Sequence, residues 1–265
     1  MSALKDILSN KRAELLLLKR RVSQETMKKA AYALGRKKNT LSKALRTSKN
    51  IAVIAEIKRR SPSKGLLCKN FDPARIAKQY YKAGAAALSV LTDKKFFGGS
   101  SEFIARVKKI TPLPVLRKDF ILEEYQVHET RLLGADAILL IARALPVSRM
   151  RALYREATRL GLDTLFEVHS VSELKKILVL RPKLIGVNNR DLATFKVSLG
   201  VSERLSRLIP KSALFVTESG IATTDDLRRA QSFGAHAALV GESLMRERDP
   251  GKALKRLLGA RRGTR

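Results

Sequence analysis

A short pattern of small residues occurs three times along the chain. The segments AGAAALSVL, LGADAILLI and FGAHAALVG each contain a Gly-Ala pair, further small residues and then an apolar run. Their glycines are Gly84, Gly134 and Gly234, which lie 50 and 100 residues apart. A glycine that ends a helix just before a buried strand explains each occurrence. The spacing therefore predicts a repeating helix–strand unit of about 25 residues, and the three segments sample this unit at every second or fourth copy.

Short apolar runs recur at the spacing of this unit. They are rich in Val, Ile and Leu, as expected for parallel strands that are buried on both faces. The eight predicted strands are Ile51–Lys58, Ala86–Leu91, Pro114–Lys118, Ala137–Ile141, Thr164–Val168, Leu184–Asn188, Leu214–Glu218 and Ala237–Gly241.

Helix-start signals lie between the predicted strands. Asp72 is followed by a proline at the first helical position, and Ser170 forms a capping-box pattern with Glu173. A third helix is predicted to start at Thr223 or Thr224. Eight strands that alternate with helices in a chain of 265 residues predict an α/β fold, the (β/α)8 TIM barrel.

The residues before the first predicted strand do not follow the repeat. The stretch LLLLKRRVSQETMKKAAYALGR predicts a helical extension that packs outside the barrel as a lid or cover. A membrane-binding helix is the alternative, but Leu15–Leu18 form a cluster rather than the stripe that such a helix presents. We therefore expect a single domain with a helical extension (1–48), a barrel (49–258) and a basic tail (259–265).

The chain is strongly basic, with 54 Lys and Arg residues against 24 acids and a formal net charge of +30. Such a charge suggests a nucleic acid or another anionic partner, and a solvated basic surface is the alternative. The basic residues are spread over the whole chain, Trp is absent, and no zinc-finger spacing or stacking platform is present. We therefore do not expect specific nucleic-acid binding.

Composition also bears on location. No apolar run approaches the roughly 20 residues that a membrane span requires, and the basic start of the chain lacks the features of a secretory signal. Cys68 is the only cysteine, so no disulfide can form within the chain. A reducing, cytoplasmic setting is the expectation, and a monomer is expected, with a weak dimer as the alternative.

The stretch IAVIAEIKRRSPSKG places Glu56 and Lys58 at the end of the first predicted strand. Residues two apart on a strand share a face, so the two charges project together. In a TIM barrel the active site lies at the carboxyl ends of the strands. Similar residues lie at the ends of other predicted strands, namely Lys118, Glu167, Asn188, Arg190, Glu218 and Ser219. We expect these groups to converge on one catalytic site.

Two glycine turns predict a phosphate site. ESGI, with Gly220, follows the seventh predicted strand, and VGES, with Gly241, follows the eighth. Glycine turns after these two strands, ahead of a short helix, form the usual phosphate site of this barrel, where backbone N–H groups bind the anion.

Five segments resemble, in order and spacing, the motifs of the indole-3-glycerol phosphate synthase family: IAEIKRRSPSKG, LRKDFI, GVNNRDL, TESGI and VGESLM. The resemblance covers Leu41 to Pro250, and SSEFI after the glycine pair Gly98-Gly99 is similar to the second loop of the family. It implies a small anionic substrate, 1-(2-carboxyphenylamino)-1-deoxyribulose 5-phosphate. The ring carbon attacks the ketone, carbon dioxide leaves and water is eliminated, with no metal or organic cofactor.

The resemblance also implies catalytic roles. Lys118 matches the general acid that protonates the ketone oxygen, and we expect other cations at a partly dry mouth to lower its pKa. Glu167 matches an acid/base residue of the dehydration, and Glu56 a positioning or charge-stabilising residue. Lys58 is a second proton donor that also holds an anionic group of the substrate.

The remaining matches bind the substrate. Asn188 is expected to bind the sugar hydroxyls and Arg190 the carboxylate, while Glu218 and Ser219 form the far wall. The residues matched to the phosphate are Gly220, Gly241 and Glu242, with help from Ser61. Phe120 and Leu139 are matched to the aromatic ring, with core packing as the alternative for Leu139.

Glu242 departs from the family pattern, because serine often occupies this position. Its backbone N–H can still bind phosphate, provided that the carboxylate points away. Asp119 and Asp191 follow predicted site residues but alternate away from the mouth, so we expect them to anchor buried networks or loops.

The three histidines show no ligand spacing with each other or with Cys68, so no metal site is predicted. We interpret His128, His169 and His236 as surface or loop residues.

Two other functions are weighed against this one. Another phosphate-binding barrel, such as phosphoribosylanthranilate isomerase, would use a Cys and Asp pair, whereas the first strand offers Glu and Lys. A basic binding protein on a barrel that has lost catalysis is the second, because a fold alone does not fix function.

Overall fold

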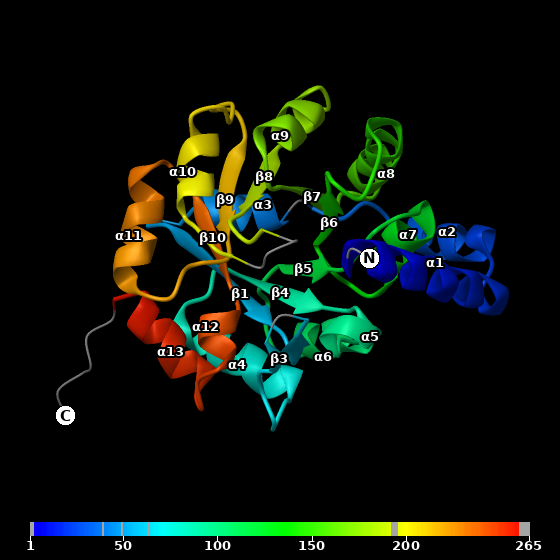
Figure 1. Ribbon diagram of the computed structural model, residues 1–265. Helices are drawn as coiled ribbons and strands as arrows, with labels where there is room; N and C mark the ends of the chain where they lie inside the picture. Colours follow the sequence, from blue (N-terminus) through cyan, green and yellow to red (C-terminus); the bar gives the residue numbers. More distant parts are fainter. Residues whose placement is uncertain (1–2, 39, 49, 63, 192–195, 260–265) are drawn as a thin grey trace.

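Among the residues that the structure describes, eight parallel strands close into a barrel (Figure 1). The structure is a computed structural model that describes residues 3–38, 40–48, 50–62, 64–191 and 196–259. The barrel order is β1-β10-β9-β8-β7-β6-β5-β4. The strands are β1 (Ala52–Ile57), β4 (Ala87–Leu91), β5 (Val115–Lys118), β6 (Ala137–Ile141), β7 (Asp163–Val168), β8 (Leu184–Asn188), β9 (Leu214–Glu218) and β10 (Ala237–Val240). Each predicted strand is confirmed to within one residue at either end, and the TIM barrel with it.

Helices follow the strands and cover the outside of the barrel (Figure 1). They are α4 (Pro73–Ala83), α5 (Lys94–Phe97), α6 (Glu102–Lys108), α7 (Glu124–Leu132), α8 (Val147–Leu160), α9 (Val171–Leu178), α10 (Gly200–Ser206), α11 (Thr224–Ser232), α12 (Glu242–Met245) and α13 (Pro250–Leu257). A small antiparallel hairpin of β2 (Arg60–Ser61) and β3 (Gly65–Leu66), which the sequence did not predict, lies between β1 and α4.

The three glycines of the repeated pattern have the conformation that the pattern predicts. Gly84, Gly134 and Gly234 have φ angles of 94°, 83° and 88°, the left-handed region that glycine enters without a steric penalty. Each follows a helix and precedes a barrel strand by a few residues. The helix–strand repeat is therefore confirmed.

The predicted helix starts are also confirmed. The Asp72 side chain accepts from the Ala74 N–H ahead of α4, and Thr223 forms a reciprocal capping box with Asp226 at α11. Ser170 accepts from the Glu173 N–H at α9. In a capping box the Glu173 carboxylate would accept from the N–H of Ser170, the N-cap residue. Here it accepts instead from the N–H of His169, one residue earlier, at 2.8 Å.

The chain before the barrel forms α1 (Ala3–Arg21), α2 (Gln24–Ala33) and α3 (Thr40–Arg46). In Figure 1, α1 and α2 lie to one side of the barrel beside α7. Helix α3 closes the barrel at the end where the strands start. There Leu41 and Leu45 are buried against residues such as Leu184 and Leu214, the first residues of β8 and β9. This end of the barrel is therefore covered by α3, which follows the stretch 15–36 that the sequence predicted as a lid or cover.

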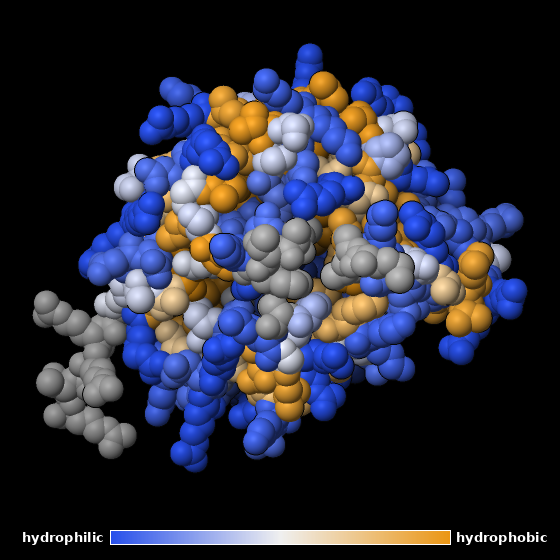
Figure 2. Space-filling model, in the orientation of Figure 1, coloured by the Kyte–Doolittle hydropathy of each residue, from blue (hydrophilic) through white to orange (hydrophobic). Residues whose placement is uncertain are grey.

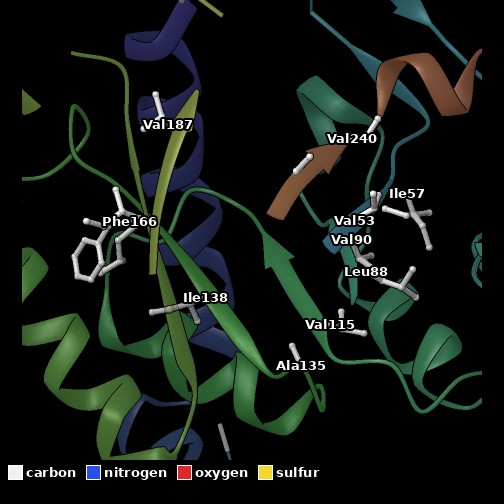
Figure 3. Packing of buried hydrophobic residues seen from close by; sticks show 14 of the residues in the cluster. Val53, Ile57, Leu88, Val90, Val115, Ala135, Ile138, Phe166, Val187 and Val240 are labelled. Carbon is white, nitrogen blue, oxygen red and sulfur yellow. The ribbon is translucent and has the colours of Figure 1, made fainter. Parts of the chain in front are cut away.

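Two layers of apolar side chains hold the barrel together. One fills the interior, where Ile54, Leu116 and Leu165 pack together. The other lies between the strands and the surrounding helices, where Figure 3 shows residues such as Val53 and Phe166. Neighbouring residues of a strand alternate between the two layers, which explains why the strands are continuous apolar runs.

On the face of the molecule shown in Figure 2, hydrophilic residues predominate and apolar residues form scattered patches. Among the described residues, no helix has both the length and the apolar character needed to cross a membrane.

The glycine that ends α8 supports a test of how the extension joins the barrel. Gly161 has a φ of 73°, and a Cβ there would lie 1.8 Å from the backbone oxygen of Lys37. At Gly134, which is also left-handed, a Cβ would meet nothing closer than 4.0 Å. We expect Gly134→Ala to cost about 1–2 kcal/mol of unfolding free energy for the backbone conformation. Gly161→Ala should cost about 1–3 kcal/mol more, because the chain must shift.

Urea unfolding midpoints of the two variants and the unchanged protein measure this difference. Equal midpoints for the two variants would show that the contact between Gly161 and the segment after α2 does not constrain the fold.

Candidate active site

A cavity of about 520 Å³ opens at the carboxyl ends of the barrel strands, the end called the mouth below. All fourteen residues that the sequence predicts for the site line it: Glu56, Lys58, Ser61, Lys118, Phe120, Leu139, Glu167, Asn188, Arg190, Glu218, Ser219, Gly220, Gly241 and Glu242. The sequence did not predict that Leu4 and Ile7 of α1 also line the cavity. The extension therefore contributes to the wall of the mouth.

The Lys118 ammonium lies between two carboxylates at the mouth. Lys118 ends β5, and its Nζ is 2.7 Å from Glu167 Oε2 and 2.6 Å from Glu218 Oε2. Burial alone would lower its pKa, but the charges of Glu167, Glu218 and Glu56 outweigh burial and raise the pKa above its ordinary value. The predicted lowering of the Lys118 pKa is therefore wrong, because the nearest charges are carboxylates and not cations.

The two carboxylates that share Lys118 have opposite pKa shifts. Burial and the negative charge of Glu167 raise the pKa of Glu218 to about 7, in spite of Lys118. For Glu167, Lys118 and His169 outweigh the effect of burial and lower the pKa. One ammonium cannot neutralise two buried carboxylates, so the two titrate as a linked pair in which Glu218 is the easier to protonate.

Glycine makes room for this group of charges. A Cβ on Gly186, inside β8, would lie 2.2 Å from Glu218 Oε1, and one on Gly241 would lie 2.4 Å from Glu56 Oε1. Gly186 is therefore a site residue that the sequence analysis missed. A lone glycine inside an apolar strand is the signal that could have found it.

At the end of β1, Glu56 and Lys58 project together as predicted. Lys58 Nζ lies 2.5 Å from Glu56 Oε1. Glu56 is only 4% exposed, whereas the Lys58 side chain is 15% exposed. The carboxylate thus holds the lysine at the edge of the cavity.

Asn188 links three parts of the mouth. The strand register sets it beside Glu218, and its Nδ2 donates to Glu167 Oε1 at 3.1 Å. Its Oδ1 accepts from the Ser219 hydroxyl and from the Arg190 N–H, both at 3.0 Å. Ser219 has a φ of 64°, a left-handed conformation that is strained outside glycine and is found mainly at functional sites.

The two predicted phosphate loops lie at the mouth, and Gly241 precedes the short helix α12. The carboxylate of Glu242 is held by Arg190 at 2.8 Å and by Arg246 at 3.3 Å. Its charge is thus paired with two guanidinium groups. Ser61 Oγ is buried and has no hydrogen-bond partner among the described residues.

A buried ionic network stands behind Lys118. Asp119 accepts from Lys11 of α1 at 3.0 Å, from Arg117 at 3.3 Å and from Thr92 at 2.6 Å. Lys11, only 4% exposed, also pairs with Asp93 at 3.2 Å. The expectation that Asp119 anchors a buried network is confirmed, but Asp119 also lines the cavity, so the expectation that it lies away from the mouth is wrong. Asp191 donates its N–H to the Lys196 carbonyl at 2.9 Å, across the loop whose residues 192–195 lie outside the described residues.

The interpretation of the histidines as surface or loop residues is wrong for His128, which is buried within α7, whereas His169 does lie in the loop between β7 and α9. His128 is fully buried, and its Nε2 lies 2.8 Å from Glu156 Oε1. The side chain of His169 is 4% exposed and lies between Glu167 and Glu173. His236 is exposed, as expected. Within the described ranges, no group of three or more His, Cys, Asp or Glu residues is arranged to hold a metal ion.

The model of the indole-3-glycerol phosphate synthase family matches residues 4–257. The indole-3-glycerol phosphate synthase of Shouchella clausii is 46% identical over 252 residues, which cover 95% of each chain. That of Chromobacterium violaceum is 50% identical over 225 residues, 85% of this chain and 82% of the relative.

Solved structures extend the likeness to more distant barrels. The 3-hexulose-6-phosphate synthase of Salmonella typhimurium superposes with a TM-score of 0.64 at 12% identity and covers 78% of this chain and 96% of its own. A thiamine phosphate pyrophosphorylase from Pyrococcus furiosus superposes with a TM-score of 0.61 at 16% identity, and the match covers 79% of this chain and 94% of that protein. At such identities the likeness concerns the fold alone.

The raised pKa of Glu218 predicts a specific pH dependence of stability. Between its ordinary value of 4.5 and about 7, the folded state binds more protons at Glu218 than the unfolded state does. Its contribution to stability is therefore present below about pH 4.5 and is lost as the pH rises towards 7. Glu218→Gln cannot ionise, so its stability relative to the unchanged protein should increase from pH 5 to pH 8.

Urea midpoints at pH 5, 6.5 and 8 test this expectation. Glu25→Gln, on the exposed face of α2, is the control and should show no such trend. A relative stability of Glu218→Gln that falls with pH would contradict the assignment.

Proposed function

This chain belongs to the indole-3-glycerol phosphate synthase family, and we propose that the charged residues of its mouth divide the steps of the family reaction among them. The enzyme is a decarboxylating, ring-closing carbon–carbon lyase of tryptophan biosynthesis. It converts 1-(2-carboxyphenylamino)-1-deoxyribulose 5-phosphate into indole-3-glycerol phosphate, carbon dioxide and water. The observation that carries the division of roles is the Lys118 ammonium between Glu167 and Glu218.

The reaction requires two proton donations and one proton removal. A donor protonates the ketone oxygen as the ring carbon forms the new bond, and the carboxylate then leaves as carbon dioxide. A second donor protonates the hydroxyl group, which leaves as water. An acceptor takes a proton from the neighbouring carbon, and the electron pair of that C–H bond forms the ring double bond. One proton is consumed from solvent in each turnover.

Lys118 is the proposed donor to the ketone oxygen. Its raised pKa keeps it charged in the resting site, and release of the proton requires that its neighbours lose negative charge. Glu218, whose pKa is raised, provides this: when Glu218 is protonated, one of the two carboxylates that stabilise the ammonium is neutral. Linked titration thus makes Lys118 a stronger acid than its resting pKa indicates.

Glu167 and Lys58 are proposed for the dehydration. Glu167 accepts the proton from carbon, because its carboxylate is ionised and is held by Lys118 and Asn188. Lys58 protonates the departing hydroxyl, since it lies at the more open edge of the cavity, where solvent can return a proton. Glu56 fixes the position of the Lys58 ammonium.

The substrate is proposed to lie across the mouth with its two anionic groups held separately. Gly220, Gly241 and Glu242 offer backbone N–H groups to the phosphate, and the unpartnered Ser61 hydroxyl offers one more donor. The aromatic ring lies against Phe120 and Leu139, which line the cavity.

Three residues complete the proposed binding of substrate. Arg190, which Glu242 holds at the rim, binds the carboxylate that leaves as carbon dioxide. Asn188 binds the sugar hydroxyls, and Ser219 holds the Asn188 side chain.

We also propose a single-domain monomer that works in the cytoplasm on a small anionic molecule, without a specific nucleic-acid partner. The chain spans nearly the whole length of the Shouchella clausii enzyme. An isomerase that uses a cysteine is disfavoured, because Cys68 does not line the cavity. A barrel without catalysis would have no reason to keep three buried carboxylates around Lys118.

Replacement of Lys118 tests its role. Lys118→Ala removes the proposed general acid, so kcat should fall by about a hundredfold or more. The assay follows the fluorescence of the indole product. Lys175→Ala, an exposed lysine on α9, controls for loss of one positive charge and should keep full activity. Near-normal turnover in folded Lys118→Ala would remove Lys118 from this role.

Competition by inorganic phosphate tests the phosphate site. Phosphate at millimolar concentration fills an anion site with a binding free energy of about −4 kcal/mol, so the apparent KM should rise while kcat stays constant. Sodium chloride at equal ionic strength is the control, because salt screens the attraction between the basic protein and its substrate. If chloride and phosphate had the same effect, the two glycine loops would not form this site.

A further inference from the structure

The imidazole of His169 lies between two carboxylates behind the catalytic cavity. Its Nε2 is 3.4 Å from Glu167 Oε1, and its Nδ1 is 3.3 Å from Glu173 Oε2. The side chain is only 4% exposed, and Nε2 is buried without a hydrogen-bond partner among the described residues. His169 does not line the cavity. Any effect of its protonation on the reaction must therefore pass through Glu167.

Glu173 determines which nitrogen of the imidazole faces the site. Its carboxylate accepts from the backbone N–H of His169 and from Arg143 Nε, both at 2.8 Å. Burial would raise the pKa of Glu173, but His169 and Arg143 outweigh it and lower the pKa to about 2. This permanent anion retains the proton on Nδ1, so Nε2 is the nitrogen that gains or loses a proton.

We propose that His169 is a positioning residue whose protonation sets the proton affinity of the catalytic Glu167. In the imidazolium state, a positive charge lies 3.4 Å from Glu167 Oε1 and stabilises the carboxylate in its ionised form. In the neutral state this charge is absent, and Glu167 becomes a stronger proton acceptor. The inference rests on the proposed role of Glu167 in removing a proton from carbon.

Three charged groups face the imidazole. Glu167 comes from β7, Glu173 from α9 and Arg143 from the segment between β6 and α8. Burial and Arg143 lower the pKa of His169, and the two carboxylates outweigh them and raise it above the ordinary 6.5. The change of state therefore falls above the pH at which a free histidine titrates, and the two carboxylates are the cause.

This arrangement predicts how the rate depends on pH. Below the pKa of His169 the imidazolium makes Glu167 a poor base, so kcat should rise as His169 loses its proton. The KM should change little, because His169 itself does not line the cavity. A purely structural role for His169 would lower stability or activity at every pH alike.

Proton NMR can measure the titration of His169 directly, because the chain has only three histidines. His169→Gln identifies the His169 signal. In Glu167→Gln and in Glu173→Gln the pKa of His169 should fall by about one unit or more, as expected when an opposite charge is removed at this distance. Glu203→Gln, an acid on the outer face of the protein, is the matched control. A His169 pKa that is the same in Glu167→Gln and in the unchanged protein would overturn the proposal.

Kinetics then connect the titration with catalysis. In His169→Gln the side chain stays neutral, so the acid limb of the kcat profile should move down by about one pH unit or more, with KM unchanged within about twofold. His236→Gln, on the exposed side of the barrel, should keep the original profile. An unchanged acid limb in His169→Gln would also overturn the proposal.

The two kinds of failure are distinguishable. The NMR titration needs no substrate, so it tests the coupling between His169 and Glu167 by itself. Lack of indole-3-glycerol phosphate formation by the unchanged protein would instead overturn the function on which the inference rests.

Discussion

The arrangement of the mouth depends on one ammonium group shared by two buried carboxylates. Lys118 comes from β5, and its partners Glu167 and Glu218 come from β7 and β9. An unpaired charge at this depth would cost several kcal/mol, so the ammonium needs a carboxylate and each ionised carboxylate needs the ammonium. The closed barrel makes this possible, because parallel strands deliver their carboxyl ends to one rim. Catalytic chemistry and barrel closure thus depend on the same strand register.

Neighbouring residues that take no part in the proposed proton transfers leave space for these buried charges or hold them in place. Gly186 leaves the space that the Glu218 carboxylate fills, and Gly241 leaves space for Glu56. Lys11 joins α1 to Asp119, beside Lys118. His169 lies on the outer side of Glu167. Several of the groups that fix the buried charges, such as Gly186, Lys11 and His169, do not line the cavity themselves, so the geometry of the mouth is held from outside it.

The sequence predicted the barrel well because its strands are buried on both faces. Such strands are unbroken apolar runs, and glycines such as Gly84 mark where each helix ends. The charged residues at the strand ends followed, since the carboxyl end of a strand is a position that can be counted along the chain, whereas Ser61, Phe120, Leu139 and Glu242 came from the family resemblance. The pKa of Lys118 could not be predicted in this way. Lys118 has the cation Arg117 beside it in sequence, but its carboxylate partners are 49 and 100 residues away. The environment of His128 likewise depends on Glu156, 28 residues away, and the two-residue strands of the hairpin are too short to produce a pattern.

The distribution of charge separates two tasks that net charge alone would confuse. The chain has 30 more cations than acids, yet the floor of the mouth holds the buried acids Glu56, Glu167 and Glu218. The basic exterior produces a long-range field that attracts an anion with a carboxylate and a phosphate. At short range the buried acids offset the charges of Lys58 and Lys118, which they hold, so these lysines do not trap an anion tightly. The uncompensated charge of the exterior attracts the anion, whereas the charges inside the mouth are paired with one another.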